Sequence, residues 1–279
     1  MYTKGDFHMH TTASDGGLSP LQLIDIARKE GFDVISITDH DTLDSLESGI
    51  KIGEALGVKV IPGVELSTIH NEETVHILGY FKNEEYKNKD FNKFLQDIKD
   101  FRVERSKKII TNLKKFFNID IDYQKVMHDA KGIIARPHIA KAIIERGYNY
   151  SWEYIFSNII SSDSPAYVPN KKISTKEGIH ILKNLDAVVV LAHPVLIKKT
   201  SIEDILELPF DGIEAIYPLN SPDEERKFIK LGKKTGKLIT AGSDFHGIND
   251  KDNNHGTLGD VYLEGEYLNN FLTKAHLNK

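Results

Sequence analysis

Short apolar segments alternate with amphipathic segments from the beginning of the chain. The apolar segments are rich in Val and Ile and have the length of buried strands: residues 6–10, 34–38, 58–61, 64–69, 74–80, 187–192, 212–216, 238–241 and 260–263. Segments with helical periodicity lie between them: residues 21–30, 43–56, 175–185 and 222–236. This order predicts an α/β fold built on a largely parallel sheet.

Local signals mark several of the expected helix ends. Ser19 and Pro20 provide an N-cap and a proline at the first helical position, and Gly31 follows as a stop. Thr175 is the expected cap of the helix that runs to residue 185, and Ser221 precedes another helix.

The pattern changes between residues 87 and 167, where lysine-rich sequence with helical periodicity shows no strand alternation. We interpret residues 87–167 as a helical insertion, or cap domain, within a barrel domain of residues 1–86 and 168–279. Ordinary crossover helices of a larger barrel are the alternative. Trp152 and the tyrosines 148, 150 and 154 could stack on a nucleobase, but packing in the core of the insertion is their expected use.

Two histidines in the first expected strand are the first candidate for chemistry. His8 and His10 are two residues apart, so on a strand both imidazoles face the same side and could bind one ion. Alone, this pair would equally suit two surface histidines on an edge strand.

Further histidines and carboxylates fall at or near the ends of other expected strands: Asp15, His40, Glu65, His76, His193, Asp244 and His246. In an α/β barrel the carboxyl ends of the strands converge on one rim, where residues distant in sequence become neighbours. Glu65 and His76 are expected within or near strands, where a charged group is costly unless it is paired or metal-bound. We therefore expect these nine residues to form one metal-binding cluster.

The donor set suits two or three divalent cations. The chain has no cysteine, so its ligands must be nitrogen and oxygen atoms, which suit manganese, zinc, iron or magnesium. A carboxylate that bridges two cations implies a bridging water, which would become a hydroxide near neutral pH and attack a phosphate ester. Asp39 and Asp41 flank His40 and could orient its imidazole.

The net charge and the hydropathy of the chain limit the kinds of binding partner that we expect. A formal net charge of −5 argues against binding of long duplex nucleic acid along its phosphates, although a local basic pocket remains compatible with it. The sequence shows neither an apolar signal region nor a segment of membrane-spanning length, so a cytoplasmic protein without membrane association is expected.

The ordered motifs HxH, SDG, TDH, VE, AHP and GSDFH resemble the PHP superfamily, named for its polymerase and histidinol phosphatase members. The resemblance covers nearly the whole chain and implies a distorted (β/α)7 barrel. It implies three ion sites: one held by His8, His10, Glu65 and Asp244, a second by Asp15, His40 and His246, and a third by Glu65, His76 and His193. Glu65 would bridge, and His193, His246 and Asp244 are the candidate catalytic residues, either histidine being able to protonate the leaving oxygen.

The helical segment resembles one branch of the superfamily in particular. Arg136, Pro137 and His138 are similar to an element of bacterial phosphoesterases that act on nucleoside 3',5'-bisphosphates and short 5'-phosphorylated oligonucleotides. Arg136 offers a planar fork for phosphate, and His138 and Lys171 are further candidate substrate contacts. A surface ion pair of Arg136 with Glu145 or Asp129 is the alternative.

Two other functions use the same residues. A histidinol-phosphatase-like or general sugar phosphatase would keep the metal site and change the substrate. A metal-stabilised binding module without activity is the non-enzymatic alternative, which the presence of every expected donor argues against.

Overall fold

The computed structural model describes residues 2–130, 134, 136–169, 173–247 and 256–276. The chain forms two compact units, one of Met1–Asn92 with Lys172–Lys279 and one of Lys93–Lys171. The domain boundaries expected from sequence, at residues 87 and 167, stay a prediction.

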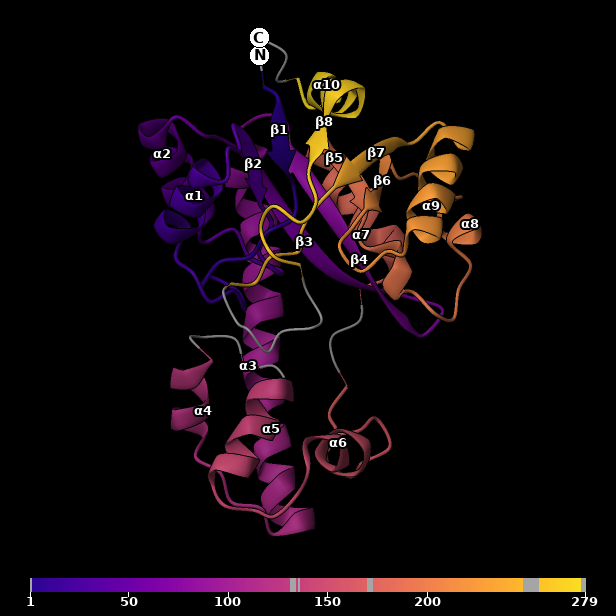
Figure 1. Ribbon diagram of the computed structural model, residues 1–279. Coiled ribbons are helices and arrows are strands. Elements are labelled where there is room, and N and C mark those ends of the chain that lie inside the picture. Colours follow the sequence, from indigo (N-terminus) through magenta and orange to yellow (C-terminus); the bar gives the residue numbers. More distant parts are fainter. Residues whose placement is uncertain (1, 131–133, 135, 170–172, 248–255, 277–279) are drawn as a thin grey trace. The chain divides into compact units, whose positions relative to one another are not determined.

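An eight-stranded sheet forms the centre of the first unit, in the order β7-β6-β5-β4-β3-β2-β1-β8 (Figure 1). Its strands are β1 (Lys4–Asp6), β2 (Val34–Ile37), β3 (Lys59–His70), β4 (Glu73–Phe81), β5 (Ala187–Leu191), β6 (Gly212–Ile216), β7 (Leu238–Ala241) and β8 (Leu263–Glu264). β8 pairs antiparallel with the start of β1.

The residues that follow β1 and β7 join the two ends of the sheet. The Phe7 amide donates to the Ala241 carbonyl at 3.2 Å, and the His10 amide donates to the Phe245 carbonyl at 2.9 Å. Met9 and Phe245 form a parallel bridge between these hydrogen bonds. The strands β1 to β7 therefore form a distorted barrel, as expected from the sequence.

β4 departs from the parallel arrangement. It pairs antiparallel with both β3 and β5, because Asn71 and Glu72 form a tight turn with φ values of 47° and 62°. The two strands expected at residues 58–61 and 64–69 are instead one strand, β3, which continues through Pro62 and Gly63.

Helices cover the outside of the barrel (Figure 1). α2 packs against β3, α7 against β4 and β5, α9 against β6 and β7, and α10 against β7 and β8. The helices of this unit are α1 (Pro20–Lys29), α2 (Leu46–Leu56), α7 (Thr175–Asn184), α8 (Ile202–Ile205), α9 (Pro222–Lys234) and α10 (Gly265–Lys274), with 3-10 turns η1 (Glu84–Lys87) and η3 (Pro194–Leu196). Ser174 caps α7, in place of the expected Thr175, and forms a capping box with Glu177.

Apolar side chains fill the barrel beside α10. Phe271 of α10 packs against Phe7 and Tyr80 at ring-centroid distances of 4.5 and 5.0 Å. Leu78 belongs to the same core, and Leu78, Tyr80 and His76 share one face of β4 because they alternate along the strand. The inner face of β4 is therefore apolar beside α10 and carries an imidazole farther from it.

The second unit is helical in its described residues. It contains most of α3 (Lys89–Phe117), then α4 (Tyr123–Asp129), α5 (Arg136–Glu145), α6 (Trp152–Tyr154) and a π-helical turn, η2 (Ile155–Ile159). Its core includes Leu113, Ile119, Ile139 and Ile155.

Of the four aromatic residues expected in the core of the second unit, one packs there and three are exposed. Tyr148 packs against that core, and its hydroxyl accepts the Asp120 amide at 2.7 Å. Tyr150, Trp152 and Tyr154 are instead 36%, 43% and 48% exposed, and the two tyrosine rings stack at 5.4 Å. In the described part of the chain, no helix has the length and apolarity needed to cross a membrane.

Candidate metal centre

The structure brings together the nine histidines and carboxylates singled out in the sequence, all within the first unit. Seven follow the ends of strands: His8 and His10 after β1, Asp15 in the next loop, His40 after β2, His193 after β5, and Asp244 and His246 after β7. Glu65 and His76 lie within β3 and β4. The sequence predicts His8 and His10 within the first strand, but both follow β1, because its regular pairing ends at Asp6.

Four buried residues form the first group of candidate ligands: His8, His10, Glu65 and Asp244. The Nε2 atoms of His8 and His10 lie 3.1 and 3.2 Å from Oε2 of Glu65. They lie 3.4 and 3.1 Å from Oδ1 of Asp244. Two imidazoles and two carboxylates thus face one small volume.

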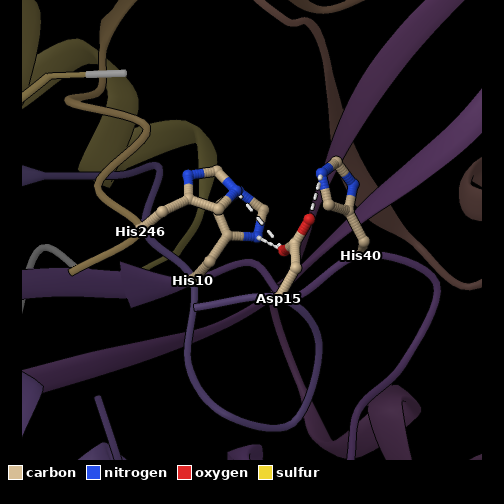
Figure 2. Close-up of side chains that lie close together, drawn as sticks. All are labelled: His10, Asp15, His40 and His246. Atoms are coloured by element: carbon tan, nitrogen blue, oxygen red, sulfur yellow. Dashed lines mark ion pairs between the residues drawn. The ribbon is translucent and has the colours of Figure 1, made fainter. Parts of the chain in front are cut away.

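Asp15 is the centre of the second group, which also contains His10, His40 and His246. Figure 2 shows the Asp15 carboxylate reaching toward all three imidazoles. Its oxygens lie 3.3 Å from Nε2 of His246, 3.9 Å from Nδ1 of His10 and 3.9 Å from Nε2 of His40. The Asp15 side chain is 39% exposed, so this group opens to solvent.

The third group joins His40, Glu65 and His76. Nδ1 of His40 lies 3.0 Å from Oε2 of Glu65, and Nδ1 of His76 lies 2.9 Å from Oε1. Nε2 of His193 lies 3.0 Å from the same Oε1 atom. Both oxygens of Glu65 are therefore surrounded by imidazole nitrogens, and this carboxylate belongs to two of the three groups.

Two of the nine residues have unusual backbone conformations. His193 has φ 25° and Asp244 has φ 53°. Aspartate and histidine are among the few non-glycine residues that occupy positive φ with some frequency, and such strain is concentrated at functional sites. At these two positions the chain turns sharply just after β5 and β7.

The carboxyl groups of the cluster are held in their ionised form. Burial opposes this, but nearby imidazoles prevail: those of His40 and His8 hold the pKa of Glu65 well below its usual range. His8 and His10 do the same for the pKa of Asp244, and His40 and His246 for that of Asp15.

Among the histidines of the cluster, the pKa is raised for His8, His10 and His76 and lowered for His40. Although burial opposes it, contacts with Asp244 and Glu65 raise the pKa of His10 to about 10. Against the same opposition, Glu214 and Glu65 raise the pKa of His8, and Glu65 raises that of His76. Burial lowers the pKa of His40 to about 4, despite the opposing charge of Glu65.

The donor atoms fit divalent cations. Many of them are buried without an aligned hydrogen-bond partner: His8 Nε2, both ring nitrogens of His10, His40 Nδ1, Glu65 Oε2, His76 Nδ1, His193 Nδ1 and Asp244 Oδ1. A buried polar atom without a partner costs free energy, and within each of the three groups the donor atoms lie within 4.8 Å of one another. Ionised carboxylates and imidazole nitrogens around shared volumes are the usual ligands of zinc, manganese and iron.

Asp39 plays a different part from the one expected. Its carboxylate accepts from the Thr11 amide and hydroxyl at 2.7 Å each, and from the hydroxyls of Ser14 and Ser45. It therefore orders the loop that carries Asp15, and its described hydrogen bonds include no imidazole. Asp41 accepts from the Ser67 amide at 2.9 Å, which ties the His40 loop to β3.

Three further residues of the site were missed in the sequence. Glu214 in β6 contacts His8, Tyr217 contacts Asp244, and Asp6 accepts from the amides of His8 and Ser243. Burial raises the pKa of Asp6 to about 7. A charged residue in the middle of the apolar segment 212–216 was a usable signal for Glu214, whereas Tyr217 resembles any aromatic residue after a strand.

Two of the three candidate substrate contacts come from the segment that the sequence predicts as a helical insertion. Arg136 and His138 belong to α5 of the second unit, and Lys171 lies outside the described residues. Arg136 is exposed, and its guanidinium lies 6.0 Å from the ring centre of Phe156. Glu145 pairs instead with Lys125, and Asp129 with His128, so the alternative ion pairs of Arg136 do not form.

Comparisons with known proteins agree with this geometry. The family model described as "PHP domain" matches residues 6–135. A 5'-3' exoribonuclease of Haemophilus influenzae is 27% identical over 252 residues, covering 88% of this chain and 91% of the relative. A 3',5'-nucleoside bisphosphate phosphatase of Chromobacterium violaceum is 27% identical over 250 residues, covering 86% of each chain.

A solved structure extends the similarity to the whole fold. The crystal structure of a protein assigned as a metal-dependent phosphoesterase from Bifidobacterium adolescentis superposes with a TM-score of 0.81 at 26% identity. The match covers 97% of this chain and 96% of that one. Residues 6–135 therefore match a PHP domain, and in sequence and fold the chain is similar to metal-dependent phosphoric ester hydrolases.

Proposed function

We propose that this enzyme hydrolyses phosphate monoesters of nucleotides, with nucleoside 3',5'-bisphosphates and short 5'-phosphorylated oligonucleotides as its substrates. The observation that carries the proposal is the arrangement around Glu65, whose two oxygens face five imidazoles. The substrate class follows the names of the Haemophilus and Chromobacterium relatives, which align over most of the chain.

We assign two or three divalent cations, of manganese, zinc, iron or magnesium, to the three donor groups. When bound, such cations polarise phosphoryl oxygens and make a bound water acidic enough to act as a nucleophile near neutral pH. The chain itself holds the ionised carboxylates of Glu65, Asp244 and Asp15 next to the imidazoles of the cluster. A negatively charged phosphate group would therefore enter a site in which the charge of these carboxylates is already balanced. Glu65 joins the first and third groups because its Oε2 and Oε1 atoms face different histidines.

His193 and His246 are the candidate general acids for the leaving oxygen. Their side chains are 8% and 10% exposed, so both lie at the margin between the buried cluster and solvent. His246 has its Nδ1 2.7 Å from the Asp244 carbonyl, an arrangement that fixes the ring. Asp244 acts beside them as the carboxylate shared by His8 and His10.

Arg136 and His138 are proposed to contact phosphate groups of the substrate. The support for Arg136 is its exposed guanidinium at the start of α5, which neither Glu145 nor Asp129 neutralises. Lys171 is proposed on its charge alone. In the same proposal, long duplex nucleic acid is not a substrate, because the net charge of the chain is −5.

A kinetic panel tests the substrate assignment. Purified enzyme loaded with manganese should hydrolyse adenosine 3',5'-bisphosphate and 5'-phosphorylated short RNA with a higher kcat/KM than histidinol phosphate or sugar phosphates. A preference for histidinol phosphate would replace the nucleotide assignment with the histidinol phosphatase alternative. Inertness of the metal-loaded protein toward every phosphate ester would favour the binding-module alternative.

A further inference from the structure

Strand β6 supplies none of the nine candidate ligands, but one residue in it and one just after it contact three of them: His8, His193 and Asp244. Glu214 lies in the middle of β6, and Tyr217 follows its last residue. Both side chains are buried, at 0% and 1% exposure. A buried carboxylate in an apolar strand is costly unless its partners compensate, so its contacts indicate its use.

Glu214 holds the ring of His8 on the side away from the cluster. Its Oε1 and Oε2 atoms lie 3.0 and 3.1 Å from Nδ1 of His8. In its neutral form, an imidazole that donates from Nδ1 to a carboxylate presents an unprotonated Nε2, and this is the nitrogen that faces Glu65 and Asp244. The contact therefore selects the form of His8 that can bind a cation.

The same carboxylate also fixes the turn that carries His193. Oε2 of Glu214 accepts the backbone amide of His193 at 2.8 Å. His193 is the residue with φ 25°, so the hydrogen bond holds a strained backbone in place. One side chain thus connects the candidate ligands after β1 and β5.

Tyr217 acts on the carboxylate of Asp244. Its hydroxyl donates to Oδ2 at 2.9 Å, while Oδ1 lies 3.4 and 3.1 Å from the Nε2 atoms of His8 and His10. One oxygen is therefore held by the tyrosine, and the other is directed into the first group.

Gly242 provides the space for these contacts. A Cβ atom at this position would lie 2.2 Å from Cβ of His8 and 2.4 Å from Oε1 of Glu214. Any side chain at residue 242 would therefore push His8 and Glu214 apart. The approach of Glu214 to His8 depends on a residue without a side chain.

We propose that Glu214 and Tyr217 are positioning residues that set the metal affinity of the group formed by His8, His10, Glu65 and Asp244. The inference rests on the proposed function only in that this group binds a cation. Glu214 fixes His8 with Nε2 available and holds the His193 turn, and Tyr217 fixes Asp244. Outer carboxylates of this kind contribute about 10- to 100-fold to metal affinity in other proteins.

The test measures Zn²⁺ affinity by competition with a fluorescent chelator in the full-length protein. E214Q should lower the affinity of the tightest site by about 10- to 100-fold. The glutamine side chain has only one acceptor oxygen, so its NH₂ group would face either Nδ1 of His8 or the backbone N–H of His193. Y217F should lower it less, because Asp244 keeps its charge. E47Q and Y262F, at exposed positions of the same unit, are the matched controls and should leave the affinity unchanged.

A second measurement does not depend on a folded variant. In zinc-loaded wild-type protein, ¹⁵N NMR of the histidines should show His8 bound through Nε2 and protonated at Nδ1. Binding of His8 through Nδ1, or an E214Q variant that keeps the wild-type affinity, would overturn the positioning role while leaving the proposed function intact. A wild-type protein that binds no zinc or manganese would instead remove both.

Discussion

His40 and Glu65 are paired twice, once through their backbones and once through their side chains. The two residues form a parallel bridge just beyond the end of β2, with the Asp41 amide donating to the Glu65 carbonyl at 2.9 Å. Nδ1 of His40 lies 3.0 Å from Oε2 of Glu65. The barrel backbone therefore sets the position of a side chain that two of the donor groups share.

Replacement of Glu65 should have the largest effect on the centre. Glu65→Gln removes the negative charge that faces five imidazoles, so we expect lower metal content and at least about a 100-fold loss of kcat/KM, beyond the loss typical of outer-sphere changes. Metal analysis and steady-state kinetics measure both. The exposed Glu47→Gln serves as the control, and wild-type metal content with wild-type turnover in Glu65→Gln would contradict the bridging role.

A substitution of Asp15 should change the second group of candidate ligands without removing a ligand of the first. Asp15 contacts His10, His40 and His246 but does not belong to the group of His8, His10, Glu65 and Asp244. We expect Asp15→Asn to lower the number of bound ions by about one while the first group keeps its ion. Mass spectrometry of the native protein counts the ions, and loss of every ion would show that the groups do not bind separately.

The stability of the metal-free protein should depend on pH with a defined sign. Because contacts with Asp244 and Glu65 raise the pKa of folded His10 from 6.5 to about 10, its stabilising charge is fully present below pH 6.5 and is lost as the pH rises through about 10. The raised pKa of His8 acts in the same direction. The Tm of chelator-treated protein should therefore fall between about pH 7 and about pH 10.

Bound metal should remove much of this dependence, since the cation replaces the protons on the ligands. Differential scanning calorimetry with and without manganese compares the two forms. A metal-free protein whose Tm rises over this range would contradict the ion-pair account of His10.

Arg136 should affect substrate binding without affecting the metals. Arg136→Ala removes an exposed guanidinium from α5, so we expect KM for adenosine 3',5'-bisphosphate to rise about 10-fold or more, with unchanged metal content. Arg146→Ala, at another exposed arginine of the second unit, is the control. Equal KM values for Arg136→Ala and the wild type would leave Arg136 without a role in phosphate binding.

Much of the barrel and the members of the cluster could be predicted from the sequence, because seven of the nine donors follow the ends of strands and Glu65 and His76 are charged or polar residues within strands. Strands β6 and β7 have the predicted bounds, since their apolar segments end at turn residues. The reversal of β4 could not be inferred from periodicity, because alternation is the same in either direction. It depends on the turn at Asn71 and Glu72.

The supporting residues were harder to predict than the donors. Glu214 and Tyr217 act through contacts with His8 and Asp244, which are distant in sequence or come from another strand. Ser174 took the place of Thr175 as helix cap because two adjacent hydroxyl residues are both acceptable caps, and only Ser174 is followed at the right spacing by Glu177. The Ser174 cap could therefore be read from local sequence, whereas the contacts of Glu214 and Tyr217 depend on three-dimensional packing.

The central claim is that side chains from His8 to His246 hold cations at shared positions, and anomalous X-ray diffraction at the manganese edge tests it most directly. Crystals of manganese-loaded protein should show two or three anomalous peaks, with Glu65 Oε1 and Oε2 facing neighbouring peaks and Asp15 facing another. A map with no peak between these side chains, or with peaks only at surface carboxylates, would contradict the account.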